Sequence, residues 1–246
     1  MSENPNISTL SEQAELALYR SQVYAFLSRA FLYPREPLLD CLTSAQGALQ
    51  ALGQEALASE LEPLKAAGHS LEDRRSDYLR VYGHTLNPDF PPYETEFGCT
   101  SLYQQTEALG DVAAFYKSCG LESTSEERAD HIGVELEFMY FLTFKEAYAW
   151  QHHGAEKAEV CVAMQKRFLE THLGCWCPLF LRLVQRKTPN PFYQVVARVG
   201  REFVTADVEL VGAHPKLLAE TDFNPKALSA RNATTWQVEG CGDDCV

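Results

Sequence analysis

The sequence lacks several features that would each assign a function class at once. It has no run of the roughly eighteen uncharged apolar residues that a membrane-spanning helix needs. It has no glycine loop of the P-loop or GxGxxG type and no GxSxG motif, so neither a nucleotide site nor a hydrolase nucleophile is visible. No glutamate is followed three residues later by a histidine, which disfavours the helical bundles that hold two iron atoms.

Basic residues are scarce. The chain has 21 Lys and Arg against 34 Asp and Glu, which gives a net charge of -13 at pH 7. Such a charge repels phosphate backbones and attracts cations over a long range. Nucleic acid is therefore disfavoured as a partner, and a basic peptide is favoured.

An export signal is also missing from the start of the sequence. Met1 to Ser11 is polar and has no basic cluster ahead of an apolar stretch. We therefore expect a cytoplasmic protein that does not insert into membranes. In that compartment the 8 cysteines are expected to stay reduced.

Sustained alternation of apolar and polar residues, the mark of strands, does not occur. Apolar residues recur instead at spacings of three and four along almost the whole chain. This pattern predicts an all-α fold, a single-domain or two-lobed bundle of about eight to ten helices. We expect residues 1–211 to form the helical domain and residues 212–246 to form a mostly irregular tail.

Capping motifs and prolines predict the ends of the main helices. Thr9 with Glu12 could open the first helix, which Pro34 must end. Ser123 with Glu126 could open the most apolar helix, which is expected to be central. The other helices are predicted at about residues 37–52, 55–67, 70–82, 100–119, 155–173, 178–186 and 191–204.

The longest interior loop covers residues 83–98, where helical periodicity stops. Pro91 and Pro92 make the backbone rigid, and the residues after them offer aromatic rings and carboxylates at fixed positions: Tyr93, Glu94, Glu96 and Phe97. Preorganised groups lose less entropy on binding, so this loop is a candidate binding element. The alternative is that its rings plug the core and its carboxylates are solvated.

A second candidate lies at the predicted start of the central helix. Residues 126–131 end in Asp130 and His131, and Glu135 follows one turn later. His131 and Glu135 share a helix face and could form a local contact. The alternative is that the acidic residues only complement the helix dipole, an effect of roughly 0.3–1 kcal/mol each.

A third candidate combines histidine and cysteine. His172, Cys175 and Cys177, together with Cys241 and Cys245 in the tail, are suitable ligands for zinc. Their spacings are not those of common zinc knuckles. The alternative is a helix junction packed by Trp176.

These three segments, in this order on an acidic helical chain, resemble the TorD/DmsD/NarJ family of chaperones for molybdenum-containing oxidoreductases. The resemblance covers roughly residues 16–203. Its most specific parts are residues 91–94 and residues 127–138, and a weaker third block includes His172, Leu173, Trp176, Pro178 and Phe180. The sequence departs from the family pattern at Tyr93, where tryptophan is common, and at Ala129, where proline is common.

The resemblance implies a protein without enzymatic activity or cofactor. It would bind the twin-arginine signal peptide, or the apo catalytic subunit itself, as a monomer or homodimer until the molybdenum cofactor is inserted. A peptide with two guanidinium groups and an apolar run needs carboxylates beside an apolar groove. The expected site joins the proline loop to the entrance of the central helix. Its residues are Pro92, Tyr93, Glu94, Phe97, Asp130, His131 and Glu135, with Glu94 and Asp130 as guanidinium contacts.

Two other functions remain open from the sequence. One is a sensor or enzyme built around a metal on the His172 and cysteine cluster. The other is a permanent structural subunit of an oxidoreductase.

Overall fold

The computed structural model describes residues 5–68, 70–83, 87–99, 101–121 and 127–223. Within these residues it contains nine α-helices and two short 3-10 helices but no strand, so the predicted all-α fold is confirmed. The α-helices are α1 (Pro5–Phe31), α2 (Leu39–Ala51), α3 (Glu55–Ala67), α4 (Leu71–Tyr82), α5 (Leu102–Ser118), α6 (Ile132–His152), α7 (Ala155–Thr171), α8 (Leu173–Lys187) and α9 (Pro191–Leu210). The 3-10 helices are η1 (Glu94–Glu96) and η2 (Glu220–Asp222).

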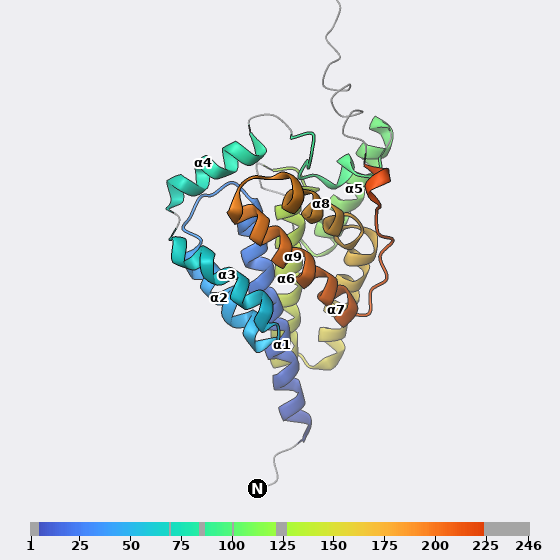
Figure 1. Ribbon diagram of the computed structural model, residues 1–246. Helices are drawn as coiled ribbons and strands as arrows, with labels where there is room; N and C mark the ends of the chain where they lie inside the picture. Colours follow the sequence, from blue (N-terminus) through green and yellow to red (C-terminus); the bar gives the residue numbers. More distant parts are fainter. Residues whose placement is uncertain (1–4, 69, 84–86, 100, 122–126, 224–246) are drawn as a thin grey trace, which may run out of the picture.

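Two long helices form the centre of the bundle. α1 packs along α6, and Figure 1 shows α1 projecting beyond the body toward the N-terminus. α7 covers α6 and also contacts α8, α8 and α9 pair with each other, and α2 packs between α1 and α3. No described helix is long and apolar enough to cross a bilayer.

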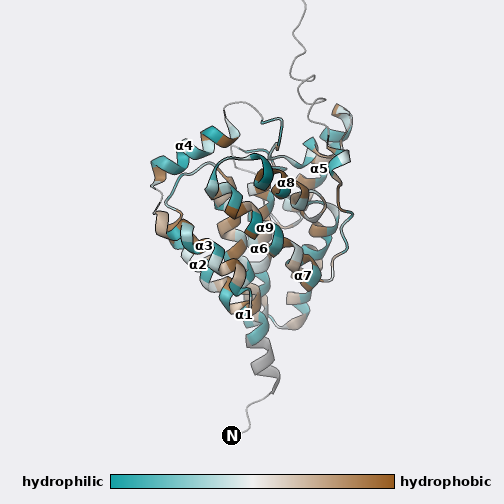
Figure 2. Cartoon of the chain, in the orientation of Figure 1, coloured by the Kyte–Doolittle hydropathy of each residue, from teal (hydrophilic) through white to brown (hydrophobic). Residues whose placement is uncertain are grey.

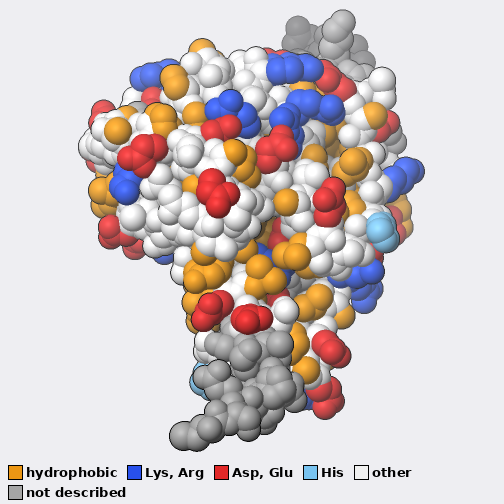
Figure 3. Space-filling view, turned by 60° about the horizontal axis from the view of Figure 1, so that its bottom comes forward, with side chains coloured by type: hydrophobic (Ala, Val, Ile, Leu, Met, Phe, Trp, Pro, Cys, Tyr) orange, Lys and Arg blue, Asp and Glu red, His pale blue; other side chains and the backbone are white. Residues whose placement is uncertain are grey.

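The hydropathy pattern matches this arrangement. The outer helices carry hydrophilic and hydrophobic residues on different sides of their axes (Figure 2), as amphipathic helices of a globular bundle do. On the face drawn in Figure 3, acidic side chains are scattered over the surface with apolar side chains between them.

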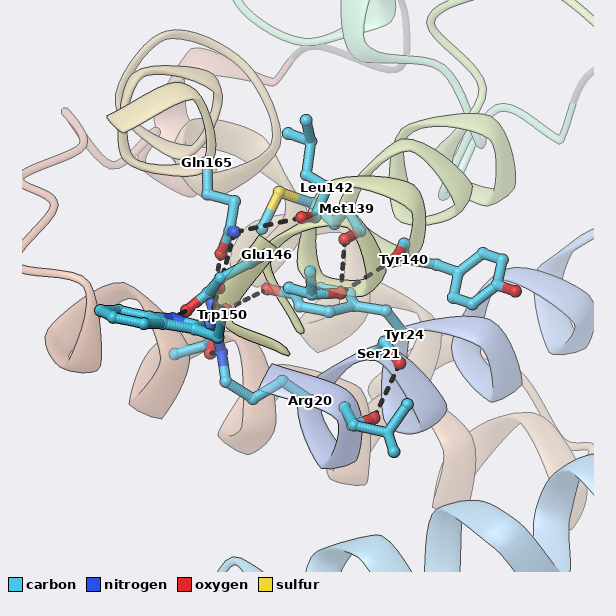
Figure 4. Close-up of polar contacts among 12 residues, drawn as sticks. Arg20, Ser21, Tyr24, Met139, Tyr140, Leu142, Glu146, Trp150 and Gln165 are labelled. Carbon is cyan, nitrogen blue, oxygen red and sulfur yellow. Dashed lines mark hydrogen bonds and ion pairs between the residues drawn. The ribbon is translucent and has the colours of Figure 1, made fainter. Parts of the chain in front are cut away.

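A buried polar cluster ties four helices together. Arg20 of α1 forms ion pairs with Glu146 of α6 and Asp207 of α9. Gln165 of α7 accepts a hydrogen bond from Arg20, and Tyr24 donates one to Asp207. Figure 4 shows part of this cluster, in which α1, α6 and α7 meet.

Several predicted helix ends are confirmed. Ser70 accepts from the Asp73 backbone N–H and the Asp73 side chain accepts in return, which closes the capping box of α4. Pro191 is the first residue of α9, behind Asn190 as its N-cap.

The predicted start of the central helix is wrong. α6 begins at Ile132 with His131 as its N-cap, so residues 127–131 precede the helix and do not form its first turn. The pair Ser123 and Glu126, predicted to open this helix, lies outside the described residues.

Two other starts also differ from prediction. α1 begins at Pro5, ahead of the predicted cap at Thr9. α8 begins at Leu173, which places Pro178 inside the helix. Glycine makes this early start possible, because a Cβ on Gly174 would lie 2.3 Å from the Leu169 carbonyl oxygen at the α7–α8 junction.

The chain beyond α9 crosses the surface of α8. The backbone N–H of Leu218 donates to the carbonyl oxygen of Cys175 (2.9 Å), and the ring of Phe223 stacks on Phe97 with centroids 4.7 Å apart. The expected irregular tail thus begins with a packed segment up to residue 223. Cys241 and Cys245 lie outside the described residues.

Candidate functional site

The proline loop and the segment before α6 lie side by side. The Glu94 N–H donates to the Asp130 carbonyl oxygen (2.9 Å), and the Ile132 N–H donates to the Pro92 carbonyl oxygen (2.8 Å). Between these two bonds, Tyr93 and His131 form an antiparallel bridge. The backbone therefore joins the two segments that the sequence analysis expected to form one site.

Asp130 holds this junction together from inside. Its side chain is 0% exposed and accepts from both the backbone N–H (3.2 Å) and the hydroxyl (2.8 Å) of Thr95. Arg128 donates to the two carboxylate oxygens through Nε (3.0 Å) and Nη2 (2.8 Å). A client arginine could therefore reach Asp130 only by displacing the chain's own Arg128.

His131 fixes the start of α6. Its Nδ1 accepts from the backbone N–H of Gly133 (3.1 Å), and burial, assisted by the nearby charge of Arg128, lowers its pKa to about 3. The ring is therefore neutral at pH 7, with its proton on Nε2. That nitrogen is buried and has no hydrogen-bond partner among the described residues. No side-chain bond joins His131 to Glu135, a contact that the sequence had left open.

Tyr93 is the half-buried rim of the loop. The guanidinium carbon of Arg128 lies 4.4 Å from the centre of its ring, and its hydroxyl donates to Glu127 at 3.4 Å. Burial, and then the charge of Glu127, raise its pKa to about 12. Phe97 behaves differently, because it is buried against Trp176 and Phe223 in the core. The loop thus places one aromatic ring at the surface and one in the core.

The two glutamates of the predicted site lie on the inner side of the junction. Glu94 pairs with Nδ1 of His172 (3.1 Å), and Glu135 accepts from the indole N–H of Trp176 (3.1 Å). Burial raises the pKa of both carboxyl groups, and for Glu135 the charge of Glu94 adds to the effect. This link between the loop and the third sequence block was not predicted, and no spacing in the sequence indicates it.

An open groove of about 600 Å³ adjoins this junction. It lies between the end of α1, the segment that leads to α2, α4 and the start of α6. Three carboxylates, three guanidinium groups and several apolar side chains line it: Glu36, Glu127, Glu137, Arg29, Arg35, Arg74, Leu32, Tyr33, Pro34, Leu38 and Tyr78. No pattern in the sequence indicates the groove, because the residues that line it are about 100 positions apart and only folding brings them together.

The charged side chains that line the groove differ in how accessible they are to a ligand. Arg74 is buried, with its guanidinium carbon 3.7 Å from the Phe192 ring centre, and Arg29 pairs with Glu36 at 3.8 Å. Glu36 and Glu137 are exposed, and Glu127 connects the groove to Tyr93. A cationic ligand in the groove would thus meet two exposed carboxylates, together with the exposed guanidinium groups of Arg29 and Arg35.

The candidate metal ligands do not assemble in the described part of the chain. No group of three or more His, Cys, Asp or Glu there could hold an ion. His172 pairs with Glu94, the thiol of Cys175 donates to the Glu170 carbonyl oxygen, and Cys177 is fully buried. Burial raises the pKa of the Cys175 thiol to about 11.

Comparison with known proteins places the chain in a family. The family model described as nitrate reductase delta subunit matches residues 43–182, more than half of the sequence. A perchlorate reductase assembly chaperone protein of Dechloromonas aromatica is 26% identical over 83% of this chain and 95% of its own length. A TorD chaperone protein of Shewanella loihica is 33% identical over 38% of each chain.

One solved structure is also similar. It is a candidate redox enzyme maturation protein from Archaeoglobus fulgidus, with 23% identity and a TM-score of 0.44 over 76% of this chain and 93% of its own. The family match by itself covers enough of the sequence to decide membership. The chain belongs to the nitrate reductase delta subunit family, that is, to the TorD/NarJ family of redox-enzyme maturation chaperones.

Proposed function

We propose that this protein binds the twin-arginine signal peptide, the apo catalytic subunit of a molybdenum oxidoreductase, or both, in the cytoplasm. It would hold this client during cofactor insertion and before export. Family membership supports the role of chaperone, and a relative that aligns over most of both chains is named as an assembly chaperone of a reductase.

One observation carries the peptide-binding part of the proposal: a groove with exposed carboxylates and apolar walls adjoins the joined loop and helix start. Two guanidinium groups need carboxylates, and the apolar run after them needs apolar walls. Glu127 and Glu137 supply the first, and Leu32, Leu38 and Tyr78 form the start of such apolar walls beside them. Each charge-assisted bond contributes roughly 1.5–3 kcal/mol, so two arginines could provide much of a micromolar affinity.

The predicted site residues take different roles in this proposal. Tyr93 flanks the groove through Glu127, whereas Asp130 and His131 hold the frame. Glu94 is mostly buried against His172 and Glu36 pairs with Arg29, so we assign the arginine contacts to Glu127 and Glu137. Pro92, Phe97 and Glu135 support this frame from the inside.

Calorimetry with the full chain and a synthetic twin-arginine peptide tests the proposal. The double substitution Glu127→Gln with Glu137→Gln should weaken binding tenfold or more, because it removes two carboxylates from the groove. The matched control is Glu156→Gln with Glu159→Gln, two exposed carboxylates of α7. Both variants change the net charge equally, so only a local effect separates them. Equal affinities of the two variants would refute the site assignment.

A further inference from the structure

Three large aromatic side chains form an exposed row on α6. Tyr140 is 37% exposed, Phe144 47% and Tyr148 51%, at spacings of four residues along one helix face. In Figure 4 the ring of Tyr140 points away from the buried Arg20 cluster. Contiguous exposed apolar surface of this kind marks an interaction site more often than an isolated exposed side chain does.

This row continues the wall of the groove. Glu137 lines the groove, and at about 100° per residue Phe144 and Tyr148 lie within about 20° of its direction around the α6 axis. The row starts at Tyr140, one turn beyond Glu137. Along α6 the exposed side chains therefore change from a carboxylate that lines the groove to a row of aromatic rings.

α1 packs beside α6 and also carries half-buried residues beyond the groove. Arg29 lines the groove, and the half-buried residues Ala25, Gln22 and Leu18 follow it at helical spacing. The helices run antiparallel, because the Ser28 hydroxyl bonds to the Gly133 carbonyl oxygen at one end and Arg20 pairs with Glu146 further along. Together these residues form the α1–α6 stripe, which we define as Leu18, Gln22, Ala25, Tyr140, Phe144 and Tyr148.

We propose that the α1–α6 stripe binds the apolar segment that follows the arginine pair of the client signal peptide. The inference rests on the proposed function and extends it to a second surface. The order of side chains along this surface matches the order along the peptide. Carboxylates at the groove are followed by aromatic rings, and the cationic residues of the peptide are followed by apolar ones.

The dimensions of the stripe fit that occupant as a short helix. Tyr140 and Tyr148 are eight residues apart, about 12 Å along α6. The apolar region of a signal peptide has about 7–15 residues, or roughly 10–22 Å as a helix. An amphipathic or apolar helix that lies along such a surface would be anchored at one-turn intervals.

Binding of two peptides to the full-length protein tests the inference. One peptide carries the arginine pair and the apolar run, and the other carries the same pair followed by a Gly-Ser run of equal length. The variant Phe144→Ser with Tyr148→Ser should bind the apolar peptide about tenfold more weakly than the wild type does. It should bind the Gly-Ser peptide as the wild type does. Tyr140→Ser alone is a second variant and should give a smaller loss of the same kind.

The control removes apolar side chains elsewhere that are more exposed than those of the stripe. Leu102→Ser with Tyr103→Ser changes two side chains of α5 that are exposed and distant from the stripe in sequence, and it should leave both affinities unchanged. Circular dichroism and urea unfolding of each variant show whether the fold is kept.

The outcomes separate the inference from the proposed function. If neither peptide binds the wild type, the proposed function fails and the inference with it. If the apolar peptide binds the stripe variants as tightly as it binds the wild type, the inference alone is overturned. It is also overturned if the variants lose only self-association in sedimentation, or if a peptide of residues 224–246 competes for the stripe.

Discussion

The side chains at the junction show that a charged residue can stabilise the backbone around a site without contacting the ligand. Asp130 is ringed by Thr95 and Arg128, and a buried carboxylate with four donors needs no further partner. Arg128 is exposed on its other side and covers the Tyr93 ring. The sequence predicted that the proline loop and the segment before α6 lie together, and the backbone bonds between them confirm it. Which side chains face outward could not be predicted, because Arg128 and Thr95 come within reach of the Asp130 carboxylate only in the folded chain.

His131 gives a pH dependence of stability that can be measured. Its folded pKa of about 3 lies below the value of roughly 6.5 of an unfolded histidine. Above pH 6.5 neither state binds this proton, whereas below it only the unfolded chain does, so stability is lost as pH falls from about 6.5 toward 3. His131→Asn keeps an acceptor for the Gly133 N–H without this titration.

Urea unfolding at pH 7 and pH 5 tests this prediction. The wild type should lose about 2 kcal/mol more of its unfolding free energy than His131→Asn does, since each pH unit contributes roughly 1.4 kcal/mol. The surface variant His152→Asn is the control and should follow the wild-type profile. Equal losses in wild type and His131→Asn would contradict the assignment of a neutral buried ring.

At the scale of helices, periodicity and caps predicted most elements but not the starts of α1, α6 and α8. α3, α4 and α9 begin where the sequence indicated, and α4 and α9 have side-chain caps that act locally. α6 and α8 do not, because His131 and Gly174 gain their roles from contacts with neighbouring segments. The Arg20 cluster is likewise invisible to local patterns, since its partners are 126 to 187 residues away in sequence.

That cluster should dominate the stability of the bundle. Arg20→Met would leave Glu146 and Asp207 buried without their cation, and we expect it to lower the unfolding free energy by about 3–5 kcal/mol. Arg29→Met, on the same helix but in an exposed pair with Glu36, should lower it by less than about 1 kcal/mol. Urea denaturation measures both, and comparable losses would show that the buried network is not what joins the four helices.

Across the whole molecule, net charge and surface chemistry act together. In the proposed function, the charge of -13 would draw a cationic peptide toward the protein, and the groove and the α1–α6 stripe would decide where it binds. The scattered acidic side chains in Figure 3 therefore cannot by themselves define a site. The net charge in the sequence favours a basic peptide over nucleic acid as the partner. The position of the groove required the fold, because α1, α4 and α6 build it jointly.

Photo-crosslinking tests the central claim most directly. A twin-arginine peptide with a benzophenone residue beside the arginine pair is bound to the full-length protein, irradiated and mapped by mass spectrometry. We expect adducts on the groove, at residues 29–38, 74–78 and 127–137. Adducts confined to α3, α7 or α9 would place the peptide elsewhere and contradict the account.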